Sequence, residues 1–153
     1  MLSKSHRTFS LIALVAVGAV GCSAVVTSER VIREVQFSGH YNDINGVLSD
    51  GTPFTGKGWF KQGTTRGDFC LQAAEIVCSG KHSATLLRRI SGDFVCSDGT
   101  TGSYQTERVP QGSFVVPISG TGTLSDGRTA EAEFSPLEEG PGQATCFVPE
   151  IGS

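Results

Sequence analysis

Charged side chains are scarce in this sequence, and their scarcity excludes several kinds of protein. Asp, Glu, Lys and Arg make up 18% of the 153 residues, whereas about 25% is usual in soluble domains. The 12 basic residues are fewer than the 15 acidic ones, so the chain is not a basic nucleic-acid-binding protein. A long coiled coil is also excluded, because such a chain would be rich in Ala, Glu, Lys and Leu.

Long hydrophobic runs and helical periodicity are missing as well. The apolar stretch from Phe9 to Val20 covers about twelve residues, and a helix needs about 20 to cross a bilayer. Windows of twelve residues show no sustained helical period. The chain is instead rich in glycine, with 20 Gly and nine Phe. An apolar fraction of 38% argues against wholesale disorder, and the length fits one domain.

The N-terminus has the features of an export signal. Lys4 and Arg7 precede the apolar run, which ends in Ala19-Val20-Gly21-Cys22. This ending resembles the lipobox of bacterial lipoproteins, which implies cleavage before Cys22 and lipidation of that cysteine. The resemblance predicts a signal peptide over 1–21 and a lipidated N-terminus and tether over 22–34. The alternative is an ordinary secretory signal in which the cysteine occurs by chance.

The lipobox also implies a location. Lipoproteins of this kind are sorted partly by the residue after the cysteine, and Ser23 is not the Asp that retains them in the inner membrane. We therefore expect a protein of the cell envelope, anchored by palmitate and other acyl chains on Cys22 to the outer membrane and facing the periplasm. Two or three acyl chains together give stable anchoring.

Four further cysteines indicate disulfide bonds. An even number of cysteines in an exported domain predicts pairing, because the periplasm is oxidising. Three pairings are possible. One of them joins Cys70 to Cys78 and Cys96 to Cys146, and it is plausible if 72–75 forms a hairpin turn. A zinc site is not expected, because the sequence has no C-x2-C pair. The four are Cys70, Cys78, Cys96 and Cys146.

A repeated tripeptide predicts the fold class. Ser-Asp-Gly occurs at 49–51, 97–99 and 125–127, and Asp-Gly between two apolar segments is a strong hairpin signal. The chain is therefore predicted to be all-β, a small antiparallel curved sheet or partly closed barrel of about seven or eight strands built from hairpins. One β domain is expected over 35–153, with an irregular C-terminal tail from about 135 that contains three prolines. The strands are expected at 35–41, 44–48, 54–60, 83–90, 94–96, 102–106, 118–124 and 130–134.

Three segments resemble a group of uncharacterised proteobacterial exported proteins with the motifs C-S-G, C-[ST]-D-G and G-x-G-x-L-S-D-G. The segments here are Cys78-Ser79-Gly80, Cys96-Ser97-Asp98-Gly99 and the stretch 120–127. The resemblance implies a disulfide between Cys78 and Cys96, which leaves Cys70 to pair with Cys146. The alternative is Cys70–Cys78 with Cys96–Cys146. No activity is assigned to this group, so the resemblance implies a fold and a compartment only.

Few side chains suggest a binding site. Trp59 is a candidate for an exposed aromatic surface, and Arg88 with Arg89 is a candidate for docking an acidic partner. The histidines of the mature chain, His40 and His82, are expected on strand surfaces. The aspartates of the three tripeptides are expected to form turns and not a calcium site.

These observations predict a lipid-anchored, non-enzymatic binding or envelope-support module. No catalytic motif, cofactor site or metal site is expected. The expected partners are the membrane, through Cys22, and an envelope protein or cell-wall component, with no nucleic acid. An alternative function is inhibition of an envelope-attacking enzyme, because the stretch 94–99 is similar to the start of bacterial C-type lysozyme inhibitors.

Overall fold

The computed structural model describes residues 31–61, 64–84, 89–111 and 114–148, and these form nine β-strands. The all-β prediction is confirmed, with one or two strands more than expected. The predicted signal peptide and Cys22 lie outside the described residues. The strands are β1 (Val31–Leu48), β2 (Pro53–Phe60), β3 (Arg66–Ala73), β4 (Ile76–Ala84), β5 (Ile90–Cys96), β6 (Thr101–Gln111), β7 (Phe114–Leu124), β8 (Thr129–Phe134) and β9 (Glu138–Val148).

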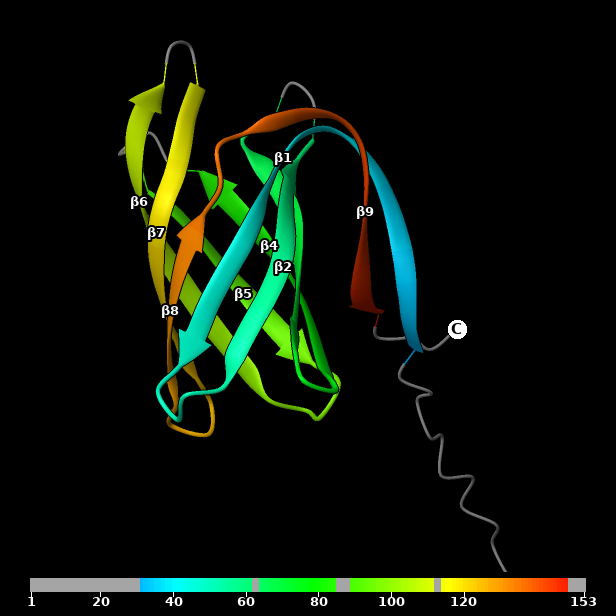
Figure 1. The fold of residues 1–153 in the computed structure, drawn as a ribbon, viewed down its shortest axis with the longest axis vertical. Coiled ribbons are helices and arrows are strands. Elements are labelled where there is room, and N and C mark those ends of the chain that lie inside the picture. Colours follow the sequence, from blue (N-terminus) through cyan, green and yellow to red (C-terminus); the bar gives the residue numbers. More distant parts are fainter. Residues whose placement is uncertain (1–30, 62–63, 85–88, 112–113, 149–153) are drawn as a thin grey trace, which may run out of the picture.

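Eight of these strands close a barrel (Figure 1). Each strand from β2 to β8 pairs antiparallel with the next one in sequence. The C-terminal half of β1 closes the ring, because it pairs with β2 on one edge and with β8 on the other. Because the barrel is closed, each of its eight strands is paired with a neighbouring strand on both sides.

The N-terminal half of β1 leaves the barrel and pairs with the whole length of β9. We call this two-stranded ribbon, residues 31–39 and 140–148, the arm. Gly39 and Gly140 lie opposite each other, and both have positive φ, +122° and +148°. Only glycine adopts such a backbone without strain, and at this point the arm bends over the barrel end and runs back along its outside (Figure 1).

The expected irregular tail from about 135 is therefore wrong. Residues 138–148 form β9, even though Pro141 lies within the strand. A proline weakens a central strand because it cannot donate a backbone hydrogen bond, but an edge strand tolerates it. Since β9 pairs only with β1, one of its edges is unpaired in the sheet order. The sequence pattern alone did not reveal that edge position.

Aromatic rings facing the barrel interior lie over glycines on neighbouring strands. Phe69 pairs with Gly80, Phe94 pairs with Gly102, and Tyr104 pairs with Gly92. A Cβ atom on any of these glycines would come within 3 Å of the ring that covers it. The glycines therefore make room for large rings in a narrow barrel, and such pairs also favour strong curvature.

A second apolar cluster lies outside the barrel, beneath the arm. Trp59 points outward from β2 and stacks on Phe37 of the arm, with ring centroids 4.4 Å apart and an interplanar angle of 5°. Val35 and Tyr41 pack against the same cluster. A disulfide between Cys70 on β3 and Cys146 on β9 covalently fixes the arm to the barrel.

Several boundary predictions need correction. The expected strands at 35–41 and 44–48 form one strand, β1, which begins at Val31, inside the predicted tether over 22–34. The expected strand at 83–90 does not exist as one unit, because β4 ends at Ala84 and β5 begins at Ile90. Strand β3 was not expected, since 66–73 lacks a flanking Ser-Asp-Gly turn. Its connection to β4 is a tight turn in which Ala74 has a φ of 52°. Positive φ is uncommon for alanine, so the sequence did not indicate a turn at this position.

Candidate functional site

The barrel encloses an apolar cavity of about 280 Å³. Its wall consists mainly of hydrocarbon and aromatic side chains from β1 to β8. Its inner end is bordered by Ile44, Phe69, Tyr104 and Phe134. The remaining apolar lining residues include Leu48, Phe54, Leu71, Ala73, Phe94, Leu124, Ala130 and Ala132.

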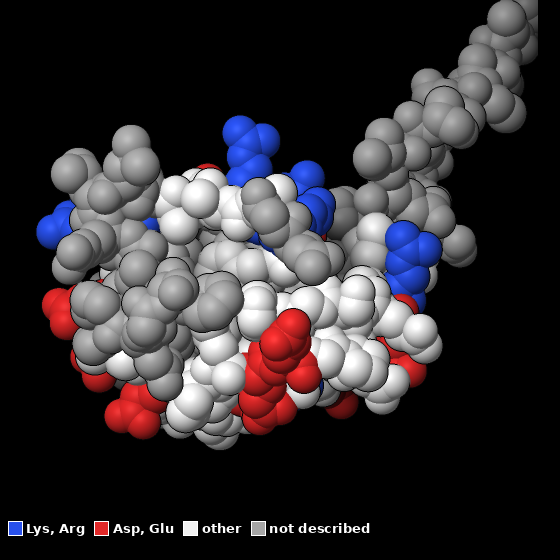
Figure 2. All heavy atoms as spheres, turned by 90° about the horizontal axis from the view of Figure 1, so that it is seen from above, with Lys and Arg blue, Asp and Glu red and all other residues white. Residues whose placement is uncertain are grey.

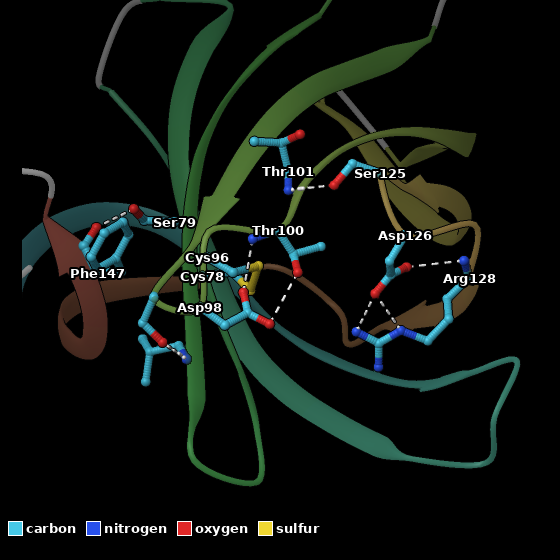
Figure 3. Close-up of a disulfide and its surroundings, with 12 residues drawn as sticks. Cys78, Ser79, Cys96, Asp98, Thr100, Thr101, Ser125, Asp126, Arg128 and Phe147 are labelled. Atoms are coloured by element: carbon cyan, nitrogen blue, oxygen red, sulfur yellow. Dashed lines mark hydrogen bonds and ion pairs between the residues drawn. A yellow bond between two sulfur atoms is a disulfide. The ribbon is translucent and has the colours of Figure 1, made fainter.

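The cavity extends to the barrel end at which four hairpin turns meet. We call these turns, residues 49–52, 74–75, 97–100 and 125–128, the mouth. Each contributes at least one residue to the cavity lining: Thr52, Ala74, Asp98 with Thr100, and Arg128. Figure 3 shows two of these turns beside the Cys78–Cys96 disulfide, whose cysteines also line the cavity.

The three Ser-Asp-Gly repeats form the same local structure at the mouth. Each aspartate accepts a hydrogen bond from the backbone N–H two residues later, at 2.9 Å for Asp50, 2.9 Å for Asp98 and 3.0 Å for Asp126. The following glycines have φ between +87° and +92°. The prediction that these aspartates form turns is confirmed.

The serines of the repeats connect neighbouring hairpins. Ser49 Oγ accepts a hydrogen bond from Thr129 N–H, Ser125 Oγ accepts one from Thr101 N–H, and Ser97 Oγ accepts one from Val77 N–H. Each serine N–H donates to a carbonyl on the same neighbouring hairpin. The mouth is therefore tied together by a chain of hydrogen bonds between hairpins.

Arg128 joins two of the turns by ion pairs. Its guanidinium donates to Asp126 at 2.7 Å and to Asp50 at 3.0 Å. The Arg128 hydrogen bond is the main cause that lowers the pKa of Asp126. Hydrogen bonds from Thr52, with Arg128 adding to them, lower the pKa of Asp50. Both carboxylates stay ionised, and the charge of Arg128 is shared between them.

Two buried polar side chains lie in the barrel interior beyond the inner end of the cavity. Asn42 is 2% exposed and His82 is 7% exposed, and among the described residues neither Asn42 Nδ2 nor His82 Nε2 has a hydrogen-bond partner. A Cβ on Gly58 would contact both side chains, so they approach the same point of the wall. The expectation that His82 lies on a strand surface is wrong.

Burial of His82 changes its protonation. Loss of hydration is the main cause that lowers its pKa to about 4, although the charge of Asp68 and the carbonyl of Trp59 act in the opposite direction. Its ring lies parallel to Phe69, with centroids 6.1 Å apart. The imidazole is therefore neutral near pH 7. The sequence shows only that His82 and Gly80 share one face of β4, and the closure of the barrel decides that this face points inward.

The four domain cysteines form the pairs that the family resemblance implied, Cys78–Cys96 and Cys70–Cys146. The alternative pairing is wrong. Cys78 and Cys96 occupy directly opposed positions on β4 and β5 and face the lumen. Cys70 points to the outside of the barrel, where β9 crosses it.

The predicted binding residues do not gather at one place. Trp59 is 7% exposed and packed under the arm, so it supplies no exposed aromatic surface. Arg89 is exposed and borders a shallow hollow on the outside of the barrel with Glu107 and Glu131. Arg88 lies outside the described residues. Figure 2, a view onto the barrel end opposite the mouth, shows both acidic and basic side chains around the rim.

Metal ligation and membrane-spanning helices find no support in the described residues. No group of three or more His, Cys, Asp or Glu side chains is close enough to hold a metal ion within the described part of the chain. No helix in that part is long and apolar enough to cross a membrane.

Comparisons with known proteins identify similar folds but no family. No family model matches the chain, and no curated protein matches it. A de novo designed fluorescence-activating β-barrel is 21% identical, over 64% of this chain and 91% of its own, with a TM-score of 0.45. A redesigned barrel solved with bound DFHBI is 14% identical, over 65% and 97%, with a TM-score of 0.45. A further redesigned barrel is 17% identical, over 66% and 91%, with a TM-score of 0.47.

Proposed function

We propose that this protein is a lipid-anchored, non-enzymatic binding module of the cell envelope and that the barrel lumen is its binding site. The observation that carries the luminal part is the apolar cavity that reaches the mouth. The lipobox at Ala19-Val20-Gly21-Cys22 supports the anchor. The two disulfides are consistent with an oxidising compartment such as the periplasm.

The size and lining of the cavity favour a small apolar ligand. A dry cavity of about 150 Å³ accommodates benzene, and sites for drug-sized ligands begin at about 300 Å³. The 280 Å³ found here fits a short acyl chain or one to two aromatic rings. Hydrocarbon walls stabilise such a ligand because they remove its apolar surface from water, and the free energy gained is about 25 cal/mol for each Å² of apolar surface buried.

The same lining favours binding over catalysis. Cys78 and Cys96 are joined in a disulfide, so they present no free thiol to the cavity. At the mouth, the Thr100 hydroxyl donates a hydrogen bond to Asp98 Oδ2, and Asp98 Oδ1 accepts one from the Thr100 backbone N–H. A catalytic site would place a nucleophile and a base toward the bound ligand.

The alternative function, inhibition of an envelope-attacking enzyme, rests on the stretch 94–99. Phe94 and Cys96 line the lumen, and 97–99 form a tight turn within the mouth. An inhibitor would need a protruding loop that carries a polar key residue, and the tight turn at 97–99 is too short to protrude in this way. This alternative is tested directly by adding the full-length protein to lysozyme and following cell-wall hydrolysis.

Site-resolved photolabelling tests the luminal proposal. The lipidated protein, in phosphatidylcholine vesicles, is illuminated with a neutral octanol analogue that carries a diazirine, and labelled residues are mapped by mass spectrometry. We expect labels on lining residues such as Leu71, Leu124 and Phe134. Ala132→Leu places three more carbons in the cavity and should reduce luminal labelling at least tenfold.

Thr121→Leu is the matched control, because it adds a leucine to the exposed outer face of the neighbouring strand. It should leave luminal labelling unchanged. Labels spread over the outer surface, or equal luminal labelling in Ala132→Leu and wild type, would refute the luminal site. The anchor is tested separately by palmitate incorporation, which Cys22→Ser should abolish.

A further inference from the structure

The charge of the mouth gives the cavity a preference for one class of ligand. The four turns carry the carboxylates of Asp50, Glu75, Asp98 and Asp126 and the single guanidinium of Arg128, a formal charge of −3. These groups surround the opening through which a luminal ligand would enter. An apolar ligand with a polar end would leave that end among them.

The positive charge of Arg128 is already neutralised by carboxylates of the mouth, so it does not attract an anionic ligand. Its guanidinium already pairs with Asp126 and with Asp50 on the next turn. These contacts raise its pKa further above the ordinary arginine value, with Asp126 as the main cause. An anionic group that approached Arg128 would have to displace a carboxylate and would then lie beside it.

Asp98 is in the opposite situation. Its carboxylate borders the cavity, and within the described part of the chain it accepts hydrogen bonds only from the neutral Thr100, through the backbone N–H at 2.9 Å and the hydroxyl at 3.0 Å. Among the described residues it has no ion-pair partner. Its negative charge therefore acts on whatever occupies the opening.

We propose that the lumen prefers amphiphiles with a cationic or neutral polar end and discriminates against carboxylates, with Asp98 as the main determinant. This inference rests on the proposed luminal function. A cationic end at the opening meets Asp98, a carboxylate of the cavity lining that has no ion-pair partner among the described residues. A fatty-acid carboxylate meets repulsion from the same group, and the hydrocarbon tail gains the same burial in each case.

Three competitors with one tail test the preference. Octylamine, octanol and octanoate compete with the diazirine probe for luminal labelling, at about 10 mM salt, where the screening length is about 30 Å. A unit charge at about 4 Å in water changes affinity about fivefold. We therefore expect octylamine to compete at least about fivefold better than octanoate, with octanol between them.

Asp98→Asn isolates the determinant. Asparagine keeps the oxygen that accepts the turn hydrogen bond, so the turn is retained while its charge is removed. The difference between octylamine and octanoate should then shrink at least threefold. Asp93→Asn removes an exposed carboxylate from the same hairpin, away from the mouth, and should leave the difference unchanged.

The outcomes separate the two proposals. If octanol competes but octanoate competes as well as octylamine, the charge preference is wrong and the luminal site stands. If the preference exists but survives in Asp98→Asn, the role of Asp98 is wrong. If none of the three compounds competes with the probe, the luminal binding function itself fails.

Discussion

The ring of Phe37 lies flat on the indole of Trp59, with centroids 4.4 Å apart, and this contact joins the arm to the outside of the barrel. The two residues belong to different parts of the fold, since Phe37 lies N-terminal to the bend at Gly39 and Trp59 lies on β2. The stack covers the only tryptophan of the chain. The arm therefore has its own apolar core, separate from the lumen.

Replacing Phe37 by alanine should loosen the arm without opening the barrel. Loss of the stack and of the packing on Trp59 should lower the free energy of unfolding by roughly 2 kcal/mol. Urea unfolding followed by tryptophan fluorescence measures this, and the emission of the folded variant should shift to longer wavelength. Gln36→Ala, on the exposed face of the same strand, is the control. An unchanged emission maximum in Phe37→Ala would contradict the packing of Phe37 on Trp59.

The two disulfides should contribute unequally. Cys70–Cys146 spans 76 residues and Cys78–Cys96 spans 18. Loop-closure entropy predicts that paired alanine replacements cost about 4.5 kcal/mol for the first bond and about 3 kcal/mol for the second. Denaturant unfolding of the two double variants tests the order. If the shorter bond proved the more stabilising, loop entropy would not be the main source of their stabilisation.

Glycines beneath aromatic rings should resist substitution. Gly80→Ala places a Cβ within 3 Å of both the Phe69 ring and the Asp93 carbonyl oxygen, and overpacking of this kind costs roughly 1–3 kcal/mol. Gly122→Ala is the control, because its Cβ would lie 3.2 Å from the Ser103 carbonyl oxygen and farther from other atoms. Thermal unfolding should show a clearly larger loss for Gly80→Ala. Equal losses would mean that the rings move aside easily.

The buried neutral imidazole of His82 should make stability depend on pH. Its pKa is about 4 in the folded state and about 6.5 in the unfolded chain, so the unfolded state binds the proton more readily. Stability is therefore fully present above pH 6.5 and falls as the pH drops toward 4, by roughly 3 kcal/mol in total.

His82→Gln removes this titration and leaves the carboxylates unchanged. Urea unfolding of wild type and variant between pH 7 and pH 4 isolates the histidine contribution as the difference between the two curves. The wild type should lose more stability than the variant over this interval. Parallel curves would show that the imidazole is hydrated or paired in the folded protein.

The chemistry of the mouth could be predicted from the sequence in part. The repeated Ser-Asp-Gly predicted three hairpins, and all three exist, because turn formation depends on adjacent residues and on the positive φ that glycine permits. The role of the serines could not be predicted. Ser49 hydrogen-bonds to Thr129, which is 80 positions away, and only the ring of strands brings them together.

Local chemistry determined the all-β class and the turns. The sequence left two cysteine pairings open, and the structure selects Cys78–Cys96 with Cys70–Cys146. The tertiary structure decided what depends on contacts between distant residues. Closure of the barrel needed β1 to pair with both β2 and β8. Burial of Trp59 needed the arm, and β9 needed an edge position that tolerates Pro141. Alternation shows that a strand has two faces, but it does not say which face looks into a cavity, since that depends on how the sheet closes.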